Sequence, residues 1–170
     1  MKGESMHTTR ENSRPAWAAF FLAATLLVGC VNQQEQGKRD IQKFMSYVAG
    51  EFVNTEGDTL VVAPVYARMI ALDTVYVERT THQGSTSGRL IELAPGKKGK
   101  IIQVAYSFTQ QNQWRNLREQ PELFTALLPK DVRAAGTCDL KLSDDRNQLT
   151  YSCGGSAPET YTRVLHGAPN

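Results

Sequence analysis

Hydrophobic positions follow two different periods along the chain. Between Asp40 and Gly50 they recur every three or four residues, which predicts an amphipathic helix that Asp40 caps and Gly50 ends. The apolar positions of this stripe are Ile41, Phe44, Met45 and Val48. From Asp58 onward apolar and β-branched residues instead alternate with polar ones, which is the period of a half-buried strand. The pattern predicts a single helix that packs against a β domain.

Strand-like runs fill most of the β domain and are separated by short turn-forming segments. They cover residues 60–70, 74–80, 89–93, 100–110, 138–142, 149–153 and 160–165. Pro64 marks the first run as an edge strand or a bulge, and Pro95–Gly99 is a strong turn signal. Residues 114–128, in which Pro121 can open a helical turn, predict a helical excursion between strands.

Short links between successive strands favour an antiparallel meander over a βαβ fold. A single domain of this kind closes most simply into a barrel, because closure removes exposed strand edges. The sequence therefore predicts a mainly β fold, an antiparallel barrel of about seven to eight strands with an N-terminal helix. A barrel of this size encloses either side chains alone or one small ligand.

The clearest local prediction is a hairpin centred between Asp145 and Arg146. Pairing residues outward from that centre places Leu142 opposite Leu149, Leu140 opposite Tyr151, and Cys138 opposite Cys153. This register gives one apolar face, one polar face and two apposed cysteines, and a slip by one residue would destroy all three. We therefore expect a structural disulfide between Cys138 and Cys153.

A separate apolar segment, residues 16–28, follows a leader that carries three basic residues. Its length is typical of a signal-peptide core and is short of the roughly 20 residues that a membrane-spanning helix needs. It ends in Leu-Val-Gly-Cys at Cys30, which resembles the lipobox of bacterial lipoproteins. The resemblance implies cleavage before Cys30 and acyl chains on that residue, which anchor it to a membrane. The alternatives are an ordinary secretory signal and a buried helix with an incidental cysteine.

On this interpretation the chain divides into a signal peptide (1–29), a lipidated tether (30–39) and a barrel domain (40–170). Val31 follows the lipidated cysteine where an aspartate would favour inner-membrane retention in enterobacteria. The expected location is the cell envelope, at the outer membrane facing the periplasm. That compartment is oxidising, which agrees with a disulfide between the two remaining cysteines.

Charge excludes one class of partner. Residues 1–29 hold three basic and two acidic residues of the chain's 19 and 17, so the mature domain is nearly neutral. Near-neutrality argues against nucleic acid and gives no sign of binding to acidic head groups. A metal site is not expected either, because no Cys-x-x-Cys pair occurs and His82 and His166 lie in unrelated stretches.

The order of several short motifs resembles the CpcT/CpeT family, whose founding members attach bilin chromophores to cysteines of phycobiliproteins. The matching segments are Gly50–Asn54, Val75–Glu78, Arg89–Leu90, Leu128–Val132 and Gly136–Leu140, the last followed by a second cysteine. The resemblance covers residues 40–153 and implies a calycin-like (lipocalin-like) antiparallel barrel. It also implies a chromophore lyase activity or a linear tetrapyrrole as ligand, with no cofactor required.

Polar and aromatic residues in otherwise apolar strands are the candidates for a ligand site. They are Tyr66, Arg68, Tyr76, Glu78, Arg89 and Tyr106. If their faces point inward, the barrel would suit an apolar ligand with carboxylates. In the alternative arrangement these faces are solvated and the core is formed by Ala67, Met69, Val75 and Val77.

No nucleophile with an adjacent base is apparent, so the sequence leaves catalysis open. Three functions remain: a membrane-anchored module that binds or escorts a hydrophobic ligand, a bilin lyase that attaches a chromophore to a protein cysteine, and a structural envelope lipoprotein with a filled barrel.

Overall fold

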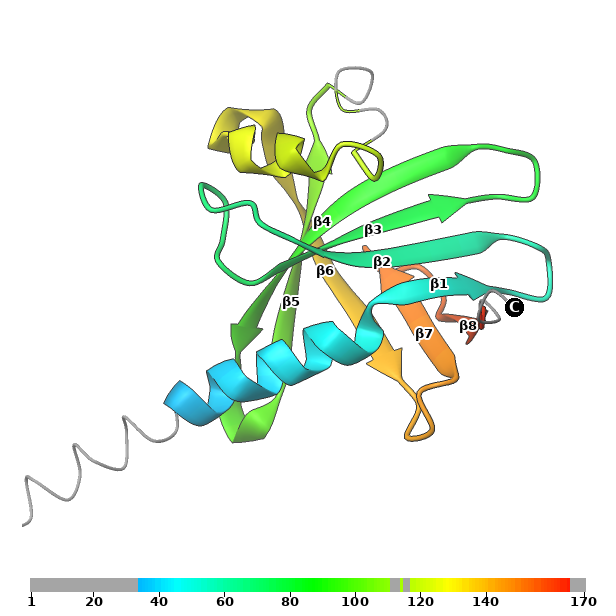
Figure 1. Ribbon diagram of the computed structural model, residues 1–170, viewed down its shortest axis with the longest axis horizontal. Helices are drawn as coiled ribbons and strands as arrows, with labels where there is room; N and C mark the ends of the chain where they lie inside the picture. The colour runs from blue at the N-terminus through cyan, green and yellow to red at the C-terminus, as the bar shows by residue number, and fades with distance from the viewer. Residues whose placement is uncertain (1–33, 111–113, 115–116, 166–170) are drawn as a thin grey trace, which may run out of the picture. The chain divides into compact units, whose positions relative to one another are not determined.

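The computed structural model describes residues 34–110, 114 and 117–165 (Figure 1). The predicted signal peptide and Cys30 lie outside these residues. A helix over residues 34–48 is followed by the eight strands β1 Gly50–Val53, β2 Thr59–Val65, β3 Thr74–Thr80, β4 Thr86–Pro95, β5 Ile101–Phe108, β6 Val132–Leu142, β7 Gln148–Cys153 and β8 Glu159–Arg163. Short 3-10 turns occupy Lys97–Gly99, Pro121–Ala126 and Pro129–Asp131.

The strands form a closed antiparallel barrel in sequence order, as predicted. β1 closes the sheet by pairing Phe52 with Arg163 and Val53 with Thr162 of β8. The sequence did not indicate β1, because its four residues, of which only Phe52 is buried, are too few to show a period of two. The helical excursion is confirmed as 3-10 turns between β5 and β6.

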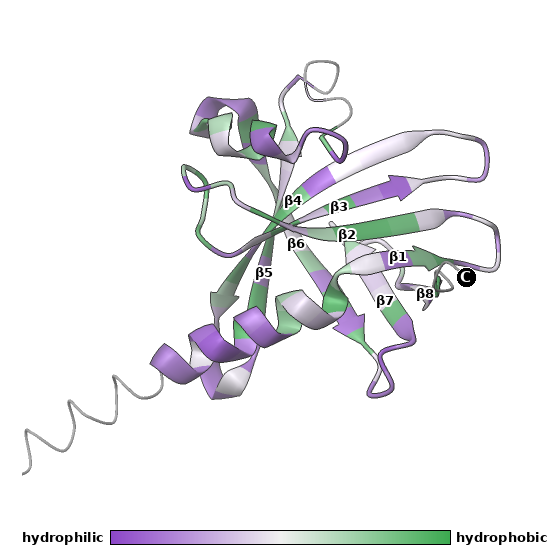
Figure 2. Cartoon of the chain, viewed as in Figure 1, coloured by the Kyte–Doolittle hydropathy of each residue, from purple (hydrophilic) through white to green (hydrophobic). Residues whose placement is uncertain are grey.

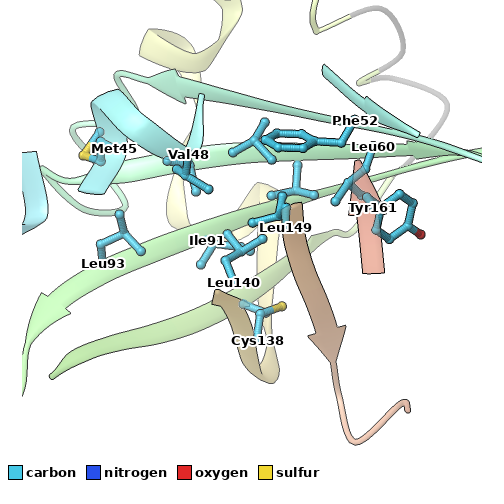
Figure 3. Packing of buried hydrophobic residues seen from close by; sticks show 14 of the residues in the cluster. Met45, Val48, Phe52, Leu60, Ile91, Leu93, Cys138, Leu140, Leu149 and Tyr161 are labelled. Atoms are coloured by element: carbon cyan, nitrogen blue, oxygen red, sulfur yellow. The ribbon is translucent and has the colours of Figure 1, made fainter. Parts of the chain in front are cut away.

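The main core fills the interior of the barrel (Figure 3). It is built from alternate residues of the strands, together with the helix residues Ile41, Met45 and Val48. Strand residues of this core include Phe52, Leu60, Val75, Val77, Ile91, Leu93, Leu140, Leu149 and Tyr161. The helix therefore plugs the barrel, as its stripe predicted.

A second core lies on the outer face of the sheet. Tyr76 and Leu90, which are cross-strand partners, pack there against Phe124 and Leu127 of the segment between β5 and β6. The rings of Tyr76 and Phe124 lie 5.1 Å apart at 56°. Both faces of β3 are consequently buried.

The predicted hairpin has the register expected of it, with Cys138 opposite Cys153 and Leu142 opposite Leu149. Cys138 and Cys153 are joined by a disulfide. Pro64 also behaves as an edge residue, because β1 pairs with β2 only as far as Val62.

Several predicted boundaries were wrong. The helix already includes residues 34–39, expected as an irregular tether, and Asp40 lies inside it, where Asp40 accepts a hydrogen bond from Gln36. The strand predicted over 60–70 ends at Val65 and gives way to a loop. The strand predicted over 89–93 extends from Thr86 to Pro95, because Thr86–Gly88 continue the pairing with β3.

The helix ends at residue 48 and its last carbonyls are satisfied by one side chain. Arg163 donates hydrogen bonds to the carbonyl oxygens of Tyr47 and Ala49, at 2.6 and 2.8 Å. Gly50 follows with φ of 150°, and a Cβ at that position would collide with the Arg163 guanidinium. Within the described residues, no helix combines the length and the hydropathy needed to span a membrane.

Candidate functional site

A cavity of about 170 Å³ lies in the part of the barrel interior that the main core leaves open. It is lined by Val77 and Arg79 of β3, Ser87 and Arg89 of β4, Tyr151 and Cys153 of β7, and Ser156 of the following loop. These residues stand at the end of β3, the start of β4 and the end of β7. In an up-and-down barrel those positions share one end, and the helix enters β1 at the other.

Strand alternation explains why polar side chains face this cavity. Val77 faces the core, so Arg79, two residues later, faces the same way. Val77 is paired with Arg89 and Arg79 with Ser87, which brings all four side chains to the interior. Apolar residues thus fill the barrel near the helix, and polar ones fill it near the opposite end.

Arg79 is held by two carboxylates. Its Nη2 donates to Asp58 Oδ2 at 2.7 Å and contacts Glu159 Oε2 at 2.9 Å. Asp58 is buried, and its pKa falls to about 2 because Arg79 and the backbone N–H of His82 donate hydrogen bonds to it. Burial and the hydrogen bond to Glu159 raise the pKa of Tyr161, which completes this network.

One donor of Arg79 is unused. Its Nε is buried and has no hydrogen-bond partner among the described residues. Because Nη2 is fixed by Asp58 and Glu159, the guanidinium cannot turn to find one. A buried donor without a partner is uncommon, and among the described residues the indole N–H of Trp114 is the other one.

Arg89 is the second arginine of the cavity and differs from the first. It is half-buried, yet its side chain makes no hydrogen bond or ion pair with any described residue. Tyr151 lies close to both arginines. Burial raises the pKa of its hydroxyl, and the positive charges of Arg89 and Arg79 partly offset that effect. The cavity therefore presents two guanidinium groups and a neutral phenol.

Of the six candidate ligand residues from the sequence, only Arg89 lines this cavity. Tyr76 belongs to the outer core, where it donates a hydrogen bond to Glu78 at 3.0 Å. Tyr106 packs against the same outer core and donates to Glu92 at 2.7 Å.

The other two candidates, Tyr66 and Arg68, lie in the loop after β2 and are exposed. On β3 the alternative arrangement holds in part, since Val75 and Val77 form the main core. Ala67 is buried, but in the outer core, and Met69 is 51% exposed.

Sequence reasoning missed Arg79, Ser87 and Tyr151 as site residues. The signal was available in the predicted hairpin, since placing Leu140 and Leu149 inside also places Tyr151 inside. No group of three or more potential metal ligands was found among the described residues.

The chain was compared with protein-family models, with curated proteins and with solved structures, and none of them matched.

Proposed function

We propose that this protein is a membrane-anchored binding barrel that takes the carboxylate of an organic ligand into the cavity between Arg79, Arg89 and Tyr151. The observation that carries the proposal is the half-buried side chain of Arg89, which makes no hydrogen bond or ion pair with any described residue. Charged side chains inside proteins are normally paired, because removing an ion from water without a partner is unfavourable. An anion is the partner that this position lacks.

The two arginines have different tasks in this proposal. Arg79 is already neutralised by Asp58 and Glu159, so it contributes a fixed polar wall of the cavity and no uncompensated charge. Arg89 contributes the uncompensated positive charge, and a guanidinium can bind both oxygens of a carboxylate at once. The hydroxyl of Tyr151, kept protonated by burial, is a second donor beside Arg89.

The cavity limits what part of a ligand can enter. Its volume of about 170 Å³ is below the roughly 300–1,000 Å³ of sites that enclose a drug-sized molecule. A linear tetrapyrrole, the ligand implied by the CpcT/CpeT resemblance, would place a propionate arm in the cavity and its ring system outside. Chromophore transfer to a protein cysteine remains the alternative function. No contact among the described residues specifically favours it.

The anchor belongs to the same proposal. Acylation of Cys30 would tether the barrel at the outer membrane, facing the periplasm, where it would hold or escort its ligand. A structural lipoprotein with a filled barrel is the competing function, and the apolar half of the interior is indeed filled.

Titration of the purified protein with biliverdin, and separately with its dimethyl ester, tests the carboxylate site by absorbance. We expect biliverdin to bind at least tenfold more tightly than the ester, and Arg89→Gln to remove that preference. Glu78→Gln is the matched control, because Glu78 lies on the neighbouring strand but on the outer face. Equal affinity for acid and ester, or the same affinity in Arg89→Gln, would overturn the proposal. Absence of any binding would favour the structural alternative.

A further inference from the structure

Three segments meet at the end of the barrel opposite the cavity. The helix approaches the turn between β4 and β5 so closely that a Cβ on Gly37 would lie 2.8 Å from Pro95. Further along the helix, Gln42 donates a hydrogen bond of 2.6 Å to Asp73, the last residue before β3. Figure 1 shows the β2–β3 loop, the β4–β5 turn and the start of the helix on the same side of the barrel.

The β2–β3 loop exposes large apolar side chains in a fixed conformation. Tyr66 is 55% exposed, Met69 51% and Leu72 74%. The loop is ordered because Ala67 is fully buried in the outer core and its carbonyl accepts hydrogen bonds from the N–H groups of Ile70 and Ala71. Figure 2 shows hydrophobic residues along this loop. Such an exposed apolar group indicates a binding surface.

The β4–β5 turn supplies positive charge on the same side. Lys97, Lys98 and Lys100 are all exposed, and residues 95–100 contain no acidic residue. None of these lysines makes an ion pair with a described residue. Lys38 and Lys43 project from the adjacent helix and are exposed as well. The near-neutral net charge of the chain averages over the whole surface and so does not show the local excess of lysine in the β4–β5 turn.

The geometry points to a docking surface for an anionic phospholipid bilayer, formed by the lysines of the β4–β5 turn and the apolar tip of the β2–β3 loop. The inference rests on the proposed membrane anchor and adds a contact that the barrel itself makes. Three residues, 31–33, separate Cys30 from the first residue of the helix, and an extended chain across that interval reaches about 14 Å at most. The anchor would therefore hold this end of the barrel near the lipid surface.

Lipid chemistry suits both parts of the surface. Clustered lysines are attracted to anionic head groups, while tyrosine, methionine and leucine side chains bury favourably at the head-group boundary. Acidic residues at this end lie outside the β4–β5 turn: Glu35 and Asp40 are on the helix, Asp73 accepts the hydrogen bond from Gln42, and Asp144 and Asp145 are in the β6–β7 turn. Docking through the lysines would turn the cavity away from the bilayer.

The test uses the full chain reconstituted in vesicles of phosphatidylglycerol and phosphatidylethanolamine, with vesicles of phosphatidylcholine as the neutral comparison. An environment-sensitive fluorophore is attached to Leu72→Cys, and a second preparation carries it on Ser85→Cys in the β3–β4 turn, at the cavity end. We expect the probe at position 72 to shift to the blue and rise at least twofold in intensity in the anionic vesicles only. The probe at position 85 should remain in water in both.

Charge reversal identifies the cause. Lys97→Glu/Lys98→Glu should abolish the shift at position 72, whereas Lys130→Glu/Arg133→Glu, which changes the net charge equally on exposed residues elsewhere, should preserve it. An unshifted probe at position 72, or equal loss in both double variants, would overturn the docking surface. Biliverdin binding is measured on the same preparations and does not depend on the result at position 72. The two proposals are therefore distinguishable.

Discussion

Arg163 lies over the ring of Phe52, with its guanidinium carbon 4.5 Å from the ring centroid. The two residues are also cross-strand partners where β8 meets β1. Because Arg163 donates to the carbonyl oxygens of Tyr47 and Ala49 as well, one side chain joins the closure of the barrel to the end of the helix that plugs it.

Replacing Arg163 should therefore destabilise the fold as a whole. We expect Arg163→Met to lower the free energy of unfolding by about 2–3 kcal/mol, since the charged hydrogen bonds to the helix carbonyls are lost. Urea denaturation followed by circular dichroism measures the change. Arg133→Met is the control, because Arg133 is exposed on β6 and should change stability by less than about 0.5 kcal/mol. Equal effects would show that Arg163 is not a joint between helix and barrel.

Acid should weaken the fold through Asp58. Its pKa is lowered from 3.8 to about 2 by the hydrogen bonds from Arg79 and from the backbone of His82. A carboxylate whose folded pKa is below its unfolded pKa stabilises the fold fully above the unfolded value, and that contribution is lost as the pH falls through the folded value. The urea midpoint should therefore fall between about pH 4 and pH 2. Asp58→Asn should have a lower urea midpoint at pH 7, and its midpoint should change less between about pH 4 and pH 2. If the midpoints of the two proteins fell in parallel with pH, Asp58 would be excluded as the cause.

The disulfide should stabilise the barrel without being reactive. Cys138 and Cys153 are 15 residues apart, and closing a loop of that length contributes roughly 3 kcal/mol in the chain-entropy model. Cys138→Ser/Cys153→Ser should lower the free energy of unfolding by about that amount. Thiol labelling of the folded, unreduced protein should leave both cysteines unmodified, and rapid labelling of both would contradict a structural bridge.

How far the sequence predicts this fold depends on whether an element has one buried face or two. The β6–β7 hairpin could be predicted residue by residue, because only one register separates its apolar and polar faces and pairs its cysteines. The bounds of β3 were predicted correctly at 74–80, but the burial of both its faces was not, because Val75 faces the main core while Tyr76 faces the outer core. The segment that covers Tyr76 lies more than 30 residues further along the chain, so no local period shows it.

The same difficulty explains why most residues of the candidate site could not be predicted from the sequence. Tyr76 and Glu78 share a face with each other, as the alternation predicted, but that face is covered by Phe124 from outside. Arg79 and Tyr151 occupy ordinary strand positions, and only the closure of the barrel brings them together with Arg89.

Gly88 should tolerate no side chain. A Cβ built on it would lie 2.8 Å from Cε2 of Tyr76, whose ring crosses β4 at this point. Gly88→Ala should displace Tyr76 from Phe124 and destabilise the fold by about 1–3 kcal/mol, as expected for overpacking. Gly84→Ala is not a matched control, because Gly84 has φ of 83°. Ser87→Ala, on the same strand, is suitable, and an equal loss of stability in both variants would exclude a steric cause.

Arg89 should be dispensable for folding, in contrast to Arg79. Arg79→Met would leave the buried carboxylate of Asp58 without its ion-pair partner and should lower the urea midpoint clearly. Arg89→Met removes a half-buried charge that no described residue compensates, and it should leave the free energy of unfolding unchanged or raise it by up to about 1 kcal/mol. Arg89→Met should thus maintain or raise the free energy of unfolding while it lowers the affinity for biliverdin, because a charge that serves to bind a ligand lowers stability when no ligand is bound. Urea denaturation of the two variants beside biliverdin titration measures both quantities, and a strongly destabilised Arg89→Met would assign Arg89 to the fold instead of the site.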